Sequence, residues 1–209
     1  MKIEFVSDIA CPWCAVGLYS LERALAALGS EITVELSFQP FELNPDMPPE
    51  GADMVQHLSA KYGTDAAQIR RNQQVIRERG AAVGFTFGER ARVWNTFDAH
   101  RLLHWAAHEG RQRELKRALL QAYLGEGRNP GSRDVLLDLA SRCGLDAERA
   151  ARILDSDEYA AEVRADEQRW LRSGINSVPS VVVDGRYLIQ GAQSPEEFEQ
   201  ALRQIAARG

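Results

Sequence analysis

The chain has 209 residues, of which 44% are hydrophobic and 26% are charged, and its formal net charge is −5. These values are typical of a globular protein with a full hydrophobic core. The acidic balance argues against a dedicated nucleic-acid surface, and no apolar run approaches the roughly 18 residues that span a bilayer. The N-terminus enters a strand pattern without a signal peptide, and there are only three cysteines. Together these features predict a cytoplasmic protein that does not bind membranes.

The first elements of the chain predict a β–α–β unit. A short buried strand is expected over residues 3–7, and leucines at helical spacing predict a helix over residues 11–28, which Gly29 ends. Apolar and polar residues alternate over residues 32–38, which is the period of a strand. A parallel pair of strands with a right-handed crossover is the default geometry of such a unit.

Cys11-Pro12-Trp13-Cys14 stands at the junction of the first strand and the first helix. Two cysteines three positions apart at a helix start share one face and can reach each other in a disulfide. The positive end of the helix would stabilise a Cys11 thiolate, which is the reactive species. A lone CxxC can also be half of a zinc site, but the only other cysteine, Cys143, has no cysteine neighbour. Redox chemistry is therefore favoured over metal binding.

Two further residues have simpler structural interpretations. Asp8 lies three residues before Cys11, where an aspartate ordinarily shapes a turn through local hydrogen bonds. This interpretation is favoured over a role in tuning the thiol or relaying its proton. Cys143 is expected to be buried and unreactive, as free cysteines commonly are.

The middle of the chain is predominantly helical. A proline-rich loop over residues 40–51 leads into helical patterns that continue to about Ser173. The expected N-caps in this region are Ser132, Asp146 and Ser156. A short amphipathic helix is indicated by Met54, Val55, Leu58 and Tyr62.

Strand patterns return in the C-terminal part of the chain. Two apolar runs joined by Asp184-Gly185 predict a β-hairpin over residues 181–189. Ser194 and Pro195 then provide the N-cap and the first position of a final helix. The order of elements is therefore β–α–β, a helical block, and β–β–α.

With a CxxC at its first helix, this order resembles a thioredoxin fold split by a helical insertion, the arrangement of the DsbA family. Within that family the sequence most resembles the cytoplasmic FrnE-like branch. The segments that carry the resemblance are residues 7–14, 95–102, 177–180 and 191–195. The resemblance implies an α/β fold class. It also implies a thioredoxin fold divided between residues 1–45 and 175–209, with an all-helical inserted domain over residues 46–174.

The resemblance also implies roles for individual residues. Cys11 would be the exposed nucleophile and Cys14 the buried resolving thiol. The Val178-Pro179 bond would be cis and lie opposite the disulfide, which leaves the Val178 backbone free to pair with a substrate segment. Further residues expected to contact substrate are Trp13, Gly191, Ala192, Asn95 and His100.

A metal site is not expected. His100, His104 and His108 share one helix face, but no carboxylate is placed as in an HExxH motif. Asn95 is expected to cap the helix that carries these histidines. No nucleotide cofactor is implied either, because the sequence holds no phosphate-binding glycine motif.

The resemblance implies a protein dithiol–disulfide oxidoreductase or isomerase that works by thiol–disulfide exchange through a redox-active Cys11–Cys14 disulfide. The expected partners are thiol or disulfide proteins, with glutathione or a thioredoxin-type protein as reductant. Trp13 carries no charge between the cysteines, so a less oxidising couple than that of periplasmic DsbA is expected. Two alternatives stay open. One is a glutathione-linked transferase or isomerase of the kappa-class or 2-hydroxychromene-2-carboxylate type, although those relatives carry serine at the position of Cys11. The other is a chaperone-like binding module.

Overall fold

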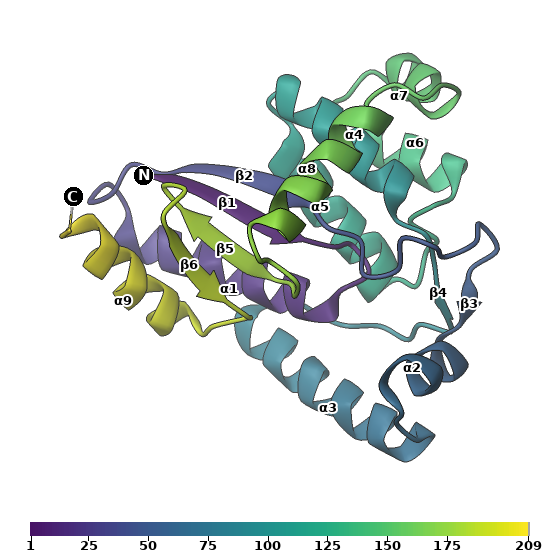
Figure 1. Ribbon diagram of the computed structural model, residues 1–209, viewed down its shortest axis with the longest axis horizontal. Coiled ribbons are helices and arrows are strands. Elements are labelled where there is room, and N and C mark those ends of the chain that lie inside the picture. The colour runs from purple at the N-terminus through teal and green to yellow at the C-terminus, as the bar shows by residue number, and fades with distance from the viewer. Residues whose placement is uncertain (209) are drawn as a thin grey trace.

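A four-stranded mixed sheet lies at the centre of the fold (Figure 1). Its strands, in sheet order, are β2 (Glu35–Pro40), β1 (Lys2–Ser7), β5 (Ser180–Val183) and β6 (Tyr187–Gln190). β1 is parallel to β2 and antiparallel to β5, so the sheet joins two segments that are far apart in the sequence. The computed structural model describes residues 1–208; Gly209, the last residue of the expected C-terminal segment, lies outside the described residues.

Pairing with β1 sets the bounds of β2. Lys2 lies opposite Glu35, and Ser7 lies opposite Pro40. Because β1 begins at Lys2, residues 32–34 have no strand partner, and β2 begins and ends later than the alternating pattern predicts. All of β1 except Lys2 is buried, as is typical of a central strand with a neighbour on each side.

The helices cover the sheet on both faces and extend beyond β2 (Figure 1). They are α1 (Pro12–Leu28), α2 (Met54–Tyr62), α3 (Ala66–Val83), α4 (Phe97–His108), α5 (Gln112–Leu120), α6 (Arg133–Arg142), α7 (Ala147–Leu154), α8 (Ala160–Arg172) and α9 (Pro195–Ala206). A π-helical turn, η1 (Gln121–Gly125), follows α5, and β3 (Ala52–Asp53) pairs with β4 (Arg92–Val93) in a small second sheet. α1 packs against α9 and α3, whereas α4, α5 and α8 pack against β2. Within residues 1–208, no helix is long and apolar enough to cross a membrane.

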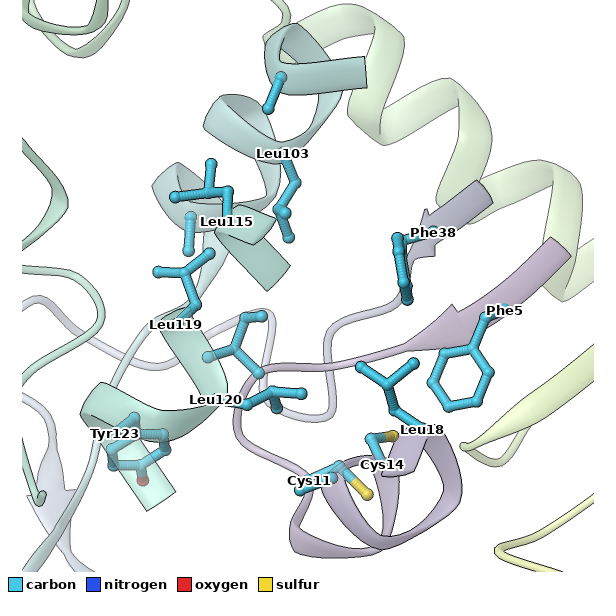
Figure 2. Close-up of a cluster of buried hydrophobic side chains, with 14 of the residues drawn as sticks. Phe5, Cys11, Cys14, Leu18, Phe38, Leu103, Leu115, Leu119, Leu120 and Tyr123 are labelled. Carbon is cyan, nitrogen blue, oxygen red and sulfur yellow. The ribbon is translucent and has the colours of Figure 1, made fainter. Parts of the chain in front are cut away.

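One hydrophobic core extends from the sheet into the helical region. Figure 2 shows Leu115, Leu119 and Leu120 of α5 in the same cluster as Phe5 of β1 and Leu18 of α1. All five side chains are fully buried. The helical region and the sheet therefore share a core, so that helices from the middle of the chain can support residues near α1.

Local signals account for most of the helix and turn boundaries. The Asp146 side chain accepts hydrogen bonds at the start of α7, and Ser194 and Glu197 form a capping box at the start of α9. Asp184 and Gly185 both have positive φ, as a tight turn between antiparallel strands requires. The hairpin and the final helix are therefore where the sequence predicts them.

One local prediction is wrong. Ser156 is not an N-cap, because α8 begins only at Ala160, after Tyr159 in the left-handed region. Ser132 is at the N-cap position of α6, but its side chain makes no capping hydrogen bond. In addition, the predicted apolar face of α2 is only partly buried, since Val55 and Tyr62 are exposed.

Candidate active site at the start of helix α1

The two cysteines of the CPWC motif lie at the N-terminal end of α1. Cys11 is the N-cap residue in extended conformation, and Pro12 is the first residue of the helix. Because Cys14 follows within the first turn, its amide donates a hydrogen bond to the Cys11 carbonyl at 3.1 Å. Both thiols are free. The start of the helix therefore holds two free thiols one turn apart.

The two thiols differ little in exposure. Cys11 exposes 4% of its surface and Cys14 none, so Cys11 is less exposed than the resemblance implies. Burial raises the pKa of the Cys14 thiol well above its ordinary value; the neighbouring Cys11 thiol adds to this shift and Lys116 opposes it. Cys14 therefore stays protonated unless something nearby takes its proton.

The Val178–Pro179 segment forms the wall opposite Cys11. The peptide bond between these two residues is cis, and the Cys11 thiol donates to the Val178 carbonyl at 3.6 Å. Gly191 donates from its amide to the Pro179 carbonyl at 2.9 Å, which holds the loop before α9 against this wall. Trp13 is half-buried at the rim. These residues come from three segments that only the fold brings together.

Gly17 allows α1 to approach this wall closely. A Cβ atom at position 17 would lie 3.0 Å from Cγ of Pro179 and 3.5 Å from Cα of Ala192. The first of these distances is shorter than ordinary van der Waals contact. The absence of a side chain at Gly17 therefore sets how near the dithiol helix lies to Pro179 and Ala192.

Asp8 lies fully buried beneath the dithiol and accepts four hydrogen bonds. The donors are the amides of Ala10 (3.2 Å) and Leu43 (2.7 Å), the Thr96 hydroxyl (2.8 Å) and Nε2 of His100 (3.3 Å). Burial alone would raise the pKa of Asp8, but the hydrogen bonds and charge of His100, with those from Leu43 and Thr96, hold it below its ordinary value. Asp8 is therefore an ionised carboxylate inside the protein.

Lys116 of α5 is the second buried charged group at this place. Its side chain is fully buried, and within residues 1–208 its Nζ has no hydrogen-bond partner. Burial lowers the pKa of Lys116 to about 8, while the nearby Cys14 and Asp8 act in the opposite direction. A pocket of about 150 Å³ between β2 and α4 is lined by Lys116, His100 and His104 among others.

The remaining predicted site residues take different positions. His100 is buried on Asp8 rather than open to the groove. Asn95 accepts from the Phe97 amide at 2.8 Å and donates to the Met47 carbonyl at 3.0 Å, so it supports the start of α4. In the described part of the chain, no group of three or more His, Cys, Asp or Glu residues could hold a metal ion.

Thr96 and Lys116 are site residues that the sequence argument missed. Thr96 lies inside the segment 95–102 that carried the resemblance, but a threonine in a sequence does not by itself indicate a hydrogen bond to a buried carboxylate. Lys116 did leave a signal, because it lies in the buried stripe of α5 beside Leu115, Leu119 and Leu120. A lysine in an apolar helical stripe is rarely fully buried, and such a position marks a candidate functional group.

Comparison with known proteins identifies the family. The family described as the DSBA-like thioredoxin domain matches residues 2–203. The chain belongs to the DsbA-like thioredoxin family. The predicted α/β fold class, a thioredoxin fold with a large helical insertion, is therefore confirmed, and the chain is a member of an oxidoreductase family.

Individual relatives agree with this assignment. A probable DsbA oxidoreductase from Streptomyces coelicolor is 38% identical, with a TM-score of 0.94 over 100% of this chain and 91% of that one. The uncharacterized protein YwbO of Bacillus subtilis is 28% identical over 97% of this chain and 96% of its own length. More distant structures share the fold. A 2-hydroxychromene-2-carboxylate isomerase is 14% identical, with a TM-score of 0.76 over 100% of this chain and 97% of that one. The cytosolic disulfide reductase DsbM of Pseudomonas aeruginosa with GSH is 17% identical, with a TM-score of 0.67 over 99% of this chain and 100% of that one.

Proposed function

We propose that this DsbA-like protein is a protein dithiol–disulfide oxidoreductase that works mainly as a reductase, with Cys11 as nucleophile and Cys14 as resolving thiol. The observation that carries the proposal is the position of the Cys11 thiol. It lies at the N-cap of α1, 3.6 Å from the Val178 carbonyl, with Cys14 in the following turn. A substrate segment that pairs with the Val178 backbone would bring its own sulfur to Cys11.

The reaction is a two-electron exchange in two steps. The Cys11 thiolate attacks one sulfur of a substrate disulfide, and the other substrate sulfur leaves as a thiolate. The Cys14 thiolate then attacks the Cys11 sulfur of the mixed disulfide, which releases the second substrate thiolate and forms the Cys11–Cys14 disulfide. A dithiol protein, or two molecules of glutathione, returns the two electrons by the reverse exchange.

Cys14 must lose its proton before the second step. Lys116 supports this step, because its charge acts on the Cys14 thiol, and the charge of Asp8 raises the pKa of Lys116 and so helps to keep the amine protonated. The positive charge of Lys116 favours the Cys14 thiolate. The negative charge of Asp8, which Thr96 and His100 hold in place, balances the charge of Lys116 in the core.

Reduction suits this site better than oxidation. The residues between the cysteines carry no charge that would stabilise the thiolate strongly, so a moderate reduction potential follows. A reducing cytoplasm is the compartment in which such an enzyme would work. The fold neighbour DsbM, named a cytosolic disulfide reductase and determined with GSH, supports glutathione as a reductant. Assignment to the FrnE-like branch is part of the same proposal.

A glutathione transferase or isomerase of the 2-hydroxychromene-2-carboxylate type is a weaker candidate. Such an enzyme takes its thiol from glutathione and has no need of a second cysteine. This chain has both Cys11 and Cys14, and the latter is buried beside Lys116. An isomerase of protein disulfides is compatible with the same chemistry, because it needs only attack by Cys11 and release.

The assignment is tested by replacing each cysteine alone. We expect Cys11→Ser to abolish the reduction of insulin disulfides, followed by turbidity, because no thiolate remains to attack. We expect Cys14→Ser to accumulate a mixed disulfide through Cys11, detected by mass spectrometry on non-reduced protein. Cys143→Ser serves as the matched control and should keep full turnover. Insulin reduction by Cys11→Ser at the wild-type rate would refute the assignment.

A further inference from the structure

Helix α2 is only lightly attached to the rest of the molecule. Met54 is its only buried residue, and it packs with Met47 and Val93 in a cluster separate from the main core. Tyr62, in the last position of the helix, exposes 58% of its surface and is the most exposed large hydrophobic residue among residues 1–208. Single exposed apolar residues are common, so the meaning of Tyr62 depends on where it lies.

Polar contacts tie the last turn of α2 to the loop that carries the dithiol. Lys61 donates from Nζ to the Leu43 carbonyl at 2.5 Å and to Oδ1 of Asn44 at 2.8 Å. The Leu43 amide in turn donates to the Asp8 carboxylate, and the Asp8 carbonyl accepts from the Cys11 amide at 3.3 Å. A continuous chain of hydrogen bonds therefore fixes the end of α2 relative to Cys11.

The electrostatic surroundings of Tyr62 agree with this position. Partial burial raises the pKa of the Tyr62 phenol, and the charge of Cys11 raises it further. A charge influences a partly exposed group only over short distances, because water and salt screen it. The geometry places the ring beside the same loop, because the Nζ of Lys61, which binds Leu43, lies 5.8 Å from the centre of the Tyr62 ring.

We propose that Tyr62 is a substrate-docking residue, whose ring receives the apolar side chain next to the reacting cysteine of an extended polypeptide. The inference rests on the proposed function and adds the class of substrate. Val178 precedes β5 on the opposite wall, and its backbone can pair with an extended segment. Tyr62 and the half-buried Trp13 provide aromatic surface for the side chains of that segment.

This arrangement separates polypeptide substrates from glutathione. Glutathione carries only glycine and a γ-linked glutamate beside its cysteine, so it has no apolar side chain to place on Tyr62. A peptide with phenylalanine next to its cysteine has one. Loss of the Tyr62 ring should therefore weaken the reduction of such a peptide and leave the reduction of glutathione disulfide unchanged.

The test compares Tyr62→Ala and Tyr62→Phe with the wild type on two substrates, glutathione disulfide and the disulfide of a short Cys-Phe peptide. For Tyr62→Ala we expect KM for the peptide to rise about fivefold to tenfold at unchanged kcat. Tyr62→Phe keeps the ring and should restore the wild-type KM. Leu188→Ala, at an exposed leucine of β6 on the far edge of the sheet, is the matched control and should change neither substrate (Figure 1).

Binding without turnover separates this inference from the proposed function. In a Cys11→Ser, Cys14→Ser background, a peptide with serine in place of cysteine should bind more weakly, by the same factor, when Tyr62→Ala is added. An unchanged peptide KM or affinity in Tyr62→Ala overturns the docking role, and so does an equal loss with glutathione disulfide. If the wild type reduces neither substrate, the proposed function fails, and the binding measurement alone then decides the role of Tyr62.

Discussion

Lys116 places an amino group in the core beside Cys14, where its Nζ has no hydrogen-bond partner in the described part of the chain. Burying a charge without a partner costs free energy, and the protein retains this cost next to its dithiol. An apolar residue of similar length would fill the space without the cost. This combination is typical of a group kept for function rather than for stability.

Lys116→Met should therefore stabilise the protein in a pH-dependent way. Burial lowers the pKa of Lys116 to about 8 from an ordinary 10.5, so the folded chain binds fewer protons than the unfolded chain between these values. The wild type then gains stability as pH rises through this window, and its penalty is largest below pH 8. We expect Lys116→Met to raise the free energy of unfolding by about 1 to 3 kcal/mol at pH 7, and by less at pH 10. Urea unfolding of the variant and the wild type at the two pH values measures this difference in the free energy of unfolding.

The exposed Lys2 provides the control for this prediction. Its side chain is about half exposed, so Lys2→Met should change stability little and equally at both pH values. An equal gain from Lys116→Met at pH 7 and pH 10 would show that the lysine charge is not the cause. Slower resolution of mixed disulfides in Lys116→Met would agree with its support of the Cys14 thiolate.

At the scale of residues, the sequence predicted site residues best where the reaction depends on their spacing along the chain. The redox pair followed from the spacing of the two cysteines, whereas the Val178-Pro179 wall was implied by the family resemblance. Asp8 was expected to shape a turn, and it does accept the Ala10 amide, but three further donors come from elsewhere in the fold. Those donors could not be inferred because their distance from Asp8 is set by tertiary packing alone.

At the scale of elements, the contact between α1 and the loop of Pro179 controls the width of the site. Gly17 faces the Pro179 ring, and α1 is otherwise a well-packed helix with buried Leu18 and Leu21. Glycine inside a helix costs about 1 kcal/mol relative to alanine. Gly17 therefore lowers the stability of α1 but allows the helix to approach Pro179 closely.

We expect Gly17→Ala to lower kcat/KM for insulin reduction roughly threefold to tenfold, because the added methyl displaces Pro179 from its place opposite Cys11. The free energy of unfolding should change by less than about 1 kcal/mol, since the gain in helix propensity offsets the crowding. Steady-state kinetics and urea unfolding on the same preparation provide both values. Unchanged kinetics would mean that the wall adapts to the methyl without moving the site.

Element types were easier to predict than their bounds. The helix pattern of α1 and the hairpin of β5 and β6 depend on local spacing and turn residues, so both were expected correctly. β2 was misplaced because its limits come from pairing with β1, and Ser156 was misassigned because α8 begins after the left-handed Tyr159. Both errors concern contacts or backbone conformations that a local pattern does not encode.

At the scale of the whole molecule, the helical region and the sheet share one core. Leu115 and Leu119 of α5 pack in the cluster that contains Phe5 and Leu18, and Asp8 binds Thr96 and His100 across the same boundary. We propose boundaries of the helical insertion near residues 46 and 174, where the chain leaves β2 and approaches β5. Even so, the insertion would not unfold alone, because its removal exposes the face of the sheet.

We therefore expect a single unfolding transition. Far-UV circular dichroism is dominated by the helices, whereas the fluorescence of Trp13 reports on the site and that of Trp94, Trp105 and Trp170 on the helical region. The urea midpoints from the two methods should coincide within error. Two separated midpoints, or a plateau between them, would show that the insertion folds as an independent unit.

The antiparallel pairing of β1 with β5 has a consequence for biosynthesis. Cys11 and its opposite wall at Val178 are 167 residues apart in the sequence. At a synthesis rate of about 5 to 20 residues per second, Val178 leaves the ribosome roughly 8 to 33 s after Cys11 does. During that interval the two thiols are near one another, but the groove that selects a partner does not yet exist. The nascent chain therefore depends on the reducing power of its surroundings to keep Cys11 unreacted until the last strands are added.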